Sequence, residues 1–174
     1  LGRRIQEINP EGHLQKRTFS ANGYLLTDTI QQTSASGLLV DRFVRNINDA
    51  NGRIVQTTDA FGNSINKDYD ALGRLATRTN ELGHKTSFRY DAQGNLAATE
   101  GPDDSGVTRV FDAAGQLTVT TNATGNSTHY LFNRDGRRIA RILPDSSPDN
   151  LDDNPREITE YNEVGLAIAN IDAV

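Results

Sequence analysis

Histidine is the side chain most able to act as a metal ligand or a general base near neutral pH. The sequence has three, at His13, His84 and His129. His13 and His84 each directly follow a glycine, in a position that Asn63 and Asn126 occupy elsewhere. A position shared by histidine and asparagine is typical of a turn or the start of a strand. We therefore expect structural roles for the histidines and no metal centre or catalytic site.

The acidic segment 144–156 is a second group that could do chemistry, because carboxylate oxygens bind Ca²⁺. Its candidate ligands are Asp145, Asp149, Asp152 and Asp153. The segment lacks the spacing and the glycine of an EF-hand loop, and the chain lacks the glycine-rich nonapeptide of calcium-binding β-rolls. The sequence also contains no nucleophile elbow, phosphate-binding loop or zinc-protease signature. We expect a solvated acidic loop, no cofactor and no enzymatic activity.

Aromatic residues form the third group, because an aromatic face can stack on a sugar ring. Six of them each precede a glycine by four residues: Phe19, Tyr69, Tyr90, Phe111, Phe132 and Tyr161. Two interpretations are open. The rings either bind carbohydrate, or they form a packing layer in which each repeat contacts the next, as cross-strand pairs do in a sheet. The packing layer is favoured, and carbohydrate binding is kept as the alternative.

The spacing of the glycines indicates the repeating structure that must position these side chains. Twelve of the 15 glycines lie on one lattice whose gaps alternate between 10 and 11 residues. From Gly23 to Gly52 and from Gly136 to Gly165 the gap is 29, one 21-residue period plus eight. A fixed period of about 20–50 residues indicates a repeat protein.

Each half of the repeat is predicted to be a strand and a turn. Segments such as 70–73 and 91–94 begin with Asp and end with Gly, which favours a type I turn followed by a left-handed residue. Such turns close β-hairpins, and six or seven residues remain for each strand. The residues expected to define the repeat structurally are Phe19, Tyr69, Asp70, Gly73, Tyr90, Asp91, Gly94, Phe111, Gly115, Phe132, Gly136, Tyr161 and Gly165.

These patterns predict an all-β fold of antiparallel β-hairpin repeats, about 21 residues each, with about fifteen strands. No segment shows a helical period. Because strands twist, so long a meander must form a curved or spiralling sheet. The whole chain, 1–174, is expected to be one repeat segment of a larger protein, since it has no initiator Met. Disturbed or long turns are expected near 31–37, 100–106 and 144–156.

The composition limits the classes of partner that this chain is expected to bind. Apolar residues make up 35% of the chain, below the roughly 45–50% of ordinary domains, as expected for a sheet with an open surface. The net charge is −5 and the basic residues are scattered, which argues against nucleic acid as a partner. There is no Cys and no apolar run of the roughly 18 residues that a membrane helix needs.

The unit from Tyr69 to Asp91 resembles the YD repeat of Rhs proteins, with Tyr-Asp-x-x-Gly-Arg-Leu at its start. The resemblance is best over 69–96, good over 111–138, and looser over 1–30 and 158–168. The family includes bacterial Rhs polymorphic toxins, the cocoon-forming subunits of insecticidal toxin complexes, and the animal teneurins. The absence of Cys fits a bacterial member better.

The resemblance implies a hollow β-shell that encloses or displays a C-terminal toxin for delivery. It also implies a bacterial protein that is secreted or carried to the cell surface. The partners would then be the rest of the shell and the enclosed toxin domain. The alternative is a repeat module that binds a cell-surface glycan or receptor. Neither function needs a cofactor.

Overall fold

The computed structural model describes residues 2–8, 10, 12–33, 37, 39–144 and 154–171. These residues form fifteen β-strands joined by turns, and they contain no helix. None of the described segments could therefore cross a membrane as a helix. The predicted fold class, all-β with antiparallel hairpins in tandem, is confirmed.

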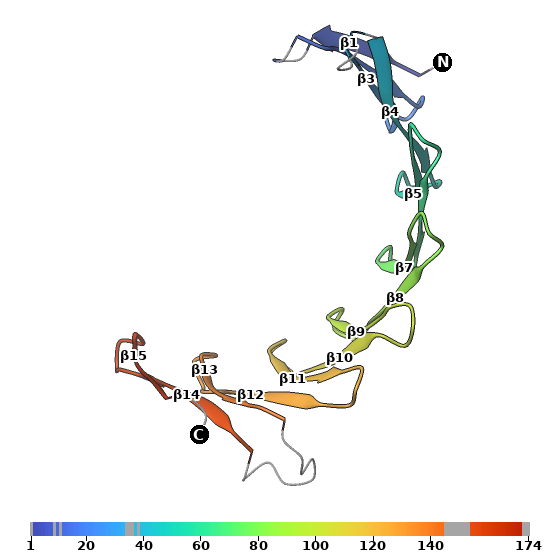
Figure 1. Cartoon of the computed structure of the whole chain (residues 1–174). Coiled ribbons are helices and arrows are strands. Elements are labelled where there is room, and N and C mark those ends of the chain that lie inside the picture. Colours follow the sequence, from blue (N-terminus) through green and yellow to red (C-terminus); the bar gives the residue numbers. More distant parts are fainter. Residues whose placement is uncertain are drawn as a thin grey trace. The chain divides into compact units, whose positions relative to one another are not determined.

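The chain divides into two compact units, Leu1–Lys85 and Thr86–Val174. Figure 1 labels most of their strands. The first unit contains β1 (Arg4–Ile8), β2 (Leu14–Phe19), β3 (Leu25–Thr33), β4 (Leu39–Asn48), β5 (Ile54–Asp59), β6 (Ser64–Tyr69) and β7 (Leu75–Thr79). The second begins within β8 (Lys85–Tyr90) and continues through β9 (Leu96–Glu100), β10 (Gly106–Phe111), β11 (Leu117–Asn122), β12 (Ser127–Phe132), β13 (Arg138–Ile142), β14 (Arg156–Tyr161) and β15 (Ala167–Ile171).

Within each unit, every strand pairs antiparallel with the next strand along the chain. Successive turns must therefore lie alternately on two edges. The Tyr-Asp edge is defined here by the turns 20–24, 49–53 and 70–74 of the first unit and 91–95, 112–116, 133–137 and 162–166 of the second. The opposite edge carries the remaining connections.

The sheet has almost no core. Among the described apolar residues only Ala98 and Ile142 are buried, at 5% and 6% exposed. At the turns, Phe61 and Leu72 directly precede a glycine and are 86% and 78% exposed. A single sheet without a covering layer accounts for both observations, because within the described ranges no other element packs against either face. The low apolar content of the sequence is consistent with this arrangement.

The two 29-residue spacings between lattice glycines, from Gly23 to Gly52 and from Gly136 to Gly165, accommodate their extra residues differently. In the first, β3 extends through Thr33 and β4 starts at Leu39, so part of the turn expected near 31–37 is strand. Residues 34–36 and 38 lie outside the described part. In the second gap β13 and β14 have ordinary lengths, and the extra residues fall in the connection between them. Its base is closed by the Leu143 N–H donating to the Pro155 carbonyl at 2.8 Å.

The irregular turn expected near 100–106 is a tight turn without a glycine at its centre. Asp103 and Asp104 have φ of 59° and 56°, and the Ser105 N–H donates to the Pro102 carbonyl at 3.2 Å. Two left-handed central residues are the arrangement of a type I′ turn. Strand β10 then starts at Gly106, so the 21-residue period is preserved across this turn.

Candidate functional site

The Asp that begins a repeat turn holds the turn together by accepting hydrogen bonds. Asp70 Oδ1 accepts the N–H groups of Leu72 and Arg74, both at 2.9 Å, and Asp70 Oδ2 accepts Arg74 Nε at 2.7 Å. The Gly73 N–H donates to the Asp70 carbonyl at 2.9 Å, and Gly73 has φ +82°. The requirement for Asp first and Gly fourth thus follows from the bonds and from the backbone conformation.

Asn can replace Asp because the two backbone bonds need only one side-chain oxygen. Asn133 Oδ1 accepts the N–H groups of Asp135 and Arg137, both at 3.0 Å. The predicted positive φ is confirmed at Gly73, Gly94 and Gly136.

The carboxylate turns are electrostatically distinct from the Asn turns. Donation by the Arg74 N–H lowers the pKa of the Asp70 carboxyl below its ordinary value of 3.8; lost hydration opposes this effect and the Arg74 side chain adds to it. The pKa of Asp49, Asp59 and Asp91 is lowered as well. These turns therefore hold their carboxylates in the charged form.

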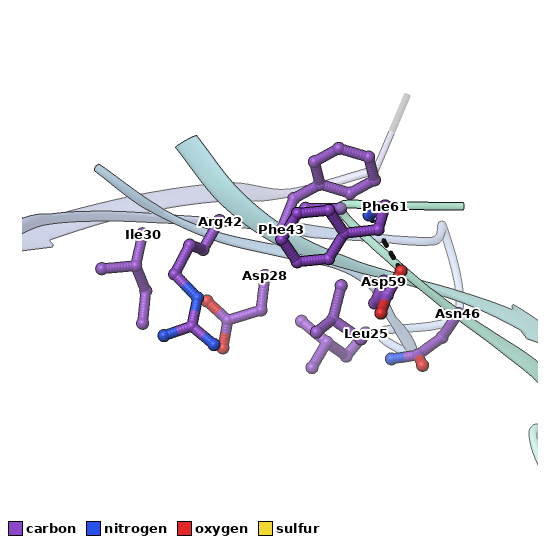
Figure 2. Close-up of a pocket in the computed structure, with 10 residues that line it drawn as sticks. Leu25, Asp28, Ile30, Arg42, Phe43, Asn46, Asp59 and Phe61 are labelled. Atoms are coloured by element: carbon purple, nitrogen blue, oxygen red, sulfur yellow. Dashed lines mark hydrogen bonds between the residues drawn. The ribbon is translucent and has the colours of Figure 1, made fainter. Parts of the chain in front are cut away.

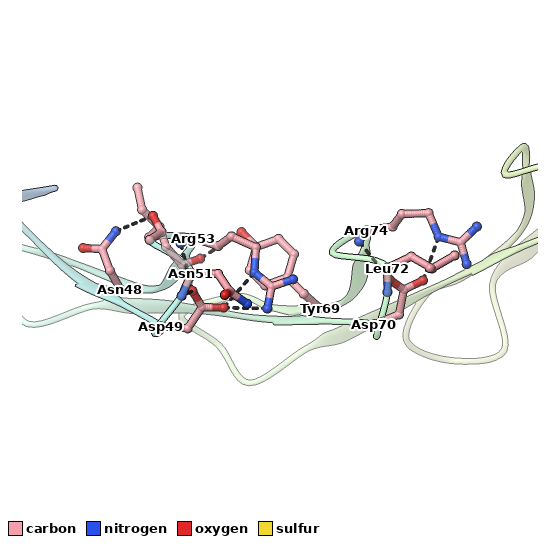
Figure 3. A network of polar contacts seen from close by, with 10 residues as sticks. Asn48, Asp49, Asn51, Arg53, Tyr69, Asp70, Leu72 and Arg74 are labelled. Atoms are coloured by element: carbon pink, nitrogen blue, oxygen red, sulfur yellow. Dashed lines mark hydrogen bonds and ion pairs between the residues drawn. The ribbon is translucent and has the colours of Figure 1, made fainter. Parts of the chain in front are cut away.

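The first unit shows how one repeat contacts the next (Figure 3). Arg53, the residue after Gly52, binds Asp49 in its own turn, with Nε 2.7 Å from Oδ2. Its guanidinium also lies over the ring of Tyr69 in the next repeat, 4.7 Å from the ring centre. The Tyr69 hydroxyl donates back to the Ile54 carbonyl at 3.0 Å. Stacking and a hydrogen bond thus join residues 15 or 16 positions apart.

The second unit repeats the arrangement. Arg137 lies over the ring of Tyr161 at 5.8 Å, and the Tyr161 hydroxyl donates to the Arg138 carbonyl at 3.0 Å. In both places the residue that follows a turn glycine of the Tyr-Asp edge covers the aromatic ring that precedes the next turn of the same edge. Cation–π contacts of this kind contribute about 0.5–1 kcal/mol at exposed sites.

A hollow of about 510 Å³ lies across β3, β4 and β5 of the first unit (Figure 2). Its lining combines the rings of Phe43 and Phe61, which are 39% and 86% exposed, with four polar side chains, Asp28, Arg42, Asn46 and Asp59. The paired registers of Asp28 with Val44 and of Val44 with Asp59 bring these strands together. Aromatic walls with a few polar groups are typical of ligand sites.

Two polar groups of the hollow are already fixed by neighbours. Asp28 accepts both Gln15 Nε2, at 2.8 Å, and Arg17 Nε, at 3.3 Å. Asn46 is 8% exposed, and its Oδ1 accepts the Thr57 hydroxyl at 3.1 Å. Such bonds hold side chains in place before a ligand arrives, which lowers the entropic cost of binding.

The structure does not bring together the three histidines considered as metal ligands or general bases. His84 lies in the turn 80–84, where its N–H donates to Asn80 Oδ1 at 2.9 Å. His129 lies in β12, opposite Val119 and Ile142, and His13 directly precedes β2. Over the described ranges no three metal-ligating side chains form a cluster. The aspartates considered for Ca²⁺, Asp145, Asp149, Asp152 and Asp153, lie outside the described residues.

Sequence reasoning missed the residue after each Tyr-Asp turn glycine. Arg53 and Arg137 were assigned no role, yet they make the contacts between repeats. The available signal was their recurrence at a fixed offset from the glycine. The hollow was missed too, because Phe43 and Phe61 do not belong to the aromatic series.

Hairpins joined by Asx-stabilised turns, with a stacked ring linking neighbouring repeats at Tyr69 and at Tyr161, define a tandem β-hairpin repeat protein. The RHS Repeat family pattern matches residues 49–85, 69–105 and 111–148, which is more than half of the chain. The chain belongs to the RHS repeat family. Comparison with curated proteins gives no significant match.

Solved structures show the same fold. The crystal structure of TcdB2-TccC3-Cdc42 contains a similar segment, with a TM-score of 0.69 and 16% identity over 90% of this chain and 9% of that chain. The crystal structure of TcdB2-TccC3-TEV gives a TM-score of 0.67 and 13% identity over 96% of this chain and 12% of that chain. This chain therefore spans about a tenth of the chains that it resembles.

Proposed function

We propose that this chain is a wall segment of an Rhs-type β-shell that encloses or displays a C-terminal toxin for delivery. The observation that supports the proposal most is the single-layered sheet, whose described residues bury only two apolar side chains. Such a sheet has two accessible faces, as a wall between an interior and an exterior requires.

The family and the similar structures support the same function. The matched repeats belong to the RHS family, and both similar chains come from crystal structures that contain TcdB2-TccC3. By analogy, the partners of this chain are the rest of its own shell and an enclosed toxin domain. The protein is then exported, and its repeats serve as structure rather than as a catalytic centre.

In this proposal the repeat-defining residues act structurally. The aromatic residues from Phe19 to Tyr161 connect repeats, the Asp residues hold turns, and the glycines allow the left-handed turn conformation. Arg53 covers one face of the Tyr69 ring, which favours a packing role for that ring over sugar stacking.

Limited proteolysis of the intact protein tests enclosure. We expect the region that follows the repeats to resist protease in native buffer, and to be cut once mild denaturant opens the repeats. The same region produced alone is the control. Cleavage of the region at equal rates in the intact protein and alone would contradict enclosure.

A second candidate function is carbohydrate binding, and the hollow across β3, β4 and β5 is the observation that favours it. Phe43 and Phe61 offer apolar ring surface, while Asp28 and Arg42 offer hydrogen-bonding groups. A glycan array with the intact protein tests it, using Phe61→Ala as the variant and Leu82→Ala as the control. Leu82 also directly precedes a turn glycine and is 74% exposed. Loss of binding in the Phe61 variant alone would support a sugar site, and no binding by the wild type would exclude one.

A further inference from the structure

We infer that the two edges of the repeat have different tasks: the Tyr-Asp edge couples each repeat to the next, whereas the opposite edge accepts inserted segments. The inference concerns how the repeats are joined. It holds whether the sheet encloses a toxin or binds a glycan.

The first observation is what lies over the turn glycines of the Tyr-Asp edge. A methyl group added at Gly136 would stand 2.8 Å from Gln116 Nε2, and one at Gly73 would stand 3.1 Å from Arg53 Nη1. At Gly52 it would collide with the Tyr24 ring, and at Gly165 with the Arg137 guanidinium. In each case the covering side chain belongs to the previous repeat and directly follows that repeat's own turn glycine.

The second observation is that the regular turns of the opposite edge are uncovered. Nothing lies within 4 Å of a methyl group added at Gly62, Gly83 or Gly125, although their φ values are +86°, +81° and +85°. The backbone conformation is therefore the same on both edges, and only the neighbouring side chain differs. On the Tyr-Asp edge Gly23 is also open, and at Gly115 the nearest atom, Asn95 Oδ1, stands 4.0 Å away. Close covering by a residue of the previous repeat is therefore described at Gly52, Gly73, Gly136 and Gly165.

The third observation is where the chain departs from the regular turn. All seven connections on the Tyr-Asp edge are five-residue turns with the same pair of backbone hydrogen bonds, as in Asp70 N–H to the Arg74 carbonyl and Gly73 N–H to the Asp70 carbonyl. The three departures are the β3–β4 connection, the tight turn 101–105 and the β13–β14 connection. All three lie on the opposite edge.

The physical reason follows from these contacts. A segment inserted at 70–74 would move Gly73 and Tyr69 away from Arg53, so contacts between repeats would be lost. At 59–63 no side chain of another repeat covers the turn glycine, so an inserted segment there would break no covering contact of this kind. The remaining cost is loop closure, which rises only slowly as the loop lengthens. Loops that bind partners are often carried on such tolerant positions of a rigid scaffold.

Matched insertions in the intact protein test the inference. The same five-residue Gly-Ser segment is placed after Leu72, on the Tyr-Asp edge, or after Phe61, on the opposite edge. Hydrogen exchange is then measured for amides of β6, which adjoins both turns. We expect at least tenfold faster exchange in β6 for the insertion after Leu72 and less than threefold for the insertion after Phe61. Equal effects, or a larger effect after Phe61, would overturn the inference.

A milder pair of variants covers the case in which the insertion after Leu72 does not fold. Arg53→Ala and Asn63→Ala each remove a side chain that follows a turn glycine and binds its own turn Asp, at 2.7 Å and 2.9 Å respectively. Only Arg53 also contacts the next repeat. Faster exchange in β6 and β7 in the Arg53 variant alone is expected, whereas equal exchange in the two variants would overturn the inference.

Discussion

Gly52 and Gly62 lie at opposite ends of β5 and have nearly the same backbone, with φ of +81° and +86°. Substituting either with Ala forces an L-residue into the left-handed region, which costs about 1–2 kcal/mol. At Gly62 the added methyl group meets open space, so this is the whole expected cost. At Gly52 the methyl group would collide with the ring of Tyr24. Displacing a packed group typically costs a further 1–3 kcal/mol or so.

We therefore expect Gly52→Ala to destabilise its neighbourhood by about 2–5 kcal/mol, and Gly62→Ala by about 1–2 kcal/mol. Hydrogen exchange of β5 amides in the intact protein measures both, because each 1.4 kcal/mol or so is a tenfold change in local opening. Tyr24→Ala provides the control in a double-mutant cycle. In that background Gly52→Ala should cost no more than Gly62→Ala. Equal costs of the two glycine substitutions beside an intact Tyr24 would refute the reasoning.

Three further predictions concern the turns and the stacked rings. Because the pKa of Asp70 is lowered on folding, its stabilising effect is complete above pH 3.8 and is lost as the pH falls through the lowered value. The protection of amides in its turn, measured relative to exchange in an unstructured chain at the same pH, should therefore fall with acidification, while the protection in the turn of Asn80 stays unchanged. Asp104→Gly should stabilise its turn by about 0.5–1 kcal/mol by relieving a left-handed Asp, and an unchanged or lower melting temperature would contradict this. Tyr69→Phe should cost about 1 kcal/mol, seen as faster exchange near Ile54, because it removes one hydrogen bond and keeps the ring.

The repeat could be predicted from the sequence because its causes are local. An Asp or Asn followed three residues later by Gly determines a turn within five residues, as the bonds of Asp70 to Leu72 and Arg74 show. The spacing of such turns then determines the strand count. Gly73, with its predicted positive φ, illustrates how far this local reasoning reaches.

The contacts between repeats could not be predicted in this way. Arg53 meets Tyr69 only because two hairpins pair in one particular register. Asn48 stands where the other repeats have an aromatic residue, and the ring over Gly52 comes instead from Tyr24 of the previous repeat. The side chain over Gly52 thus belongs to an earlier turn, and the five residues of a single turn do not identify such a partner.

Strand ends at the long gaps were also beyond local reasoning. The segment 31–37 is rich in turn-forming residues, yet residues 31–33 continue β3. Their strand conformation depends on pairing with β4, which extends to Leu39 on the other side. The hollow has the same origin, since Phe43 and Phe61 meet only through the pairing of β4 with β5.

The most direct test of the central proposal is a cryo-EM structure of the intact protein that contains this chain. The shell interpretation predicts that the hairpins of residues 2–171 continue into further hairpins of the same kind, with one face of the sheet lining an enclosed space that holds the toxin domain. A structure in which this chain forms a closed, separate domain with both faces in solvent would contradict it, and would favour the carbohydrate-binding module instead.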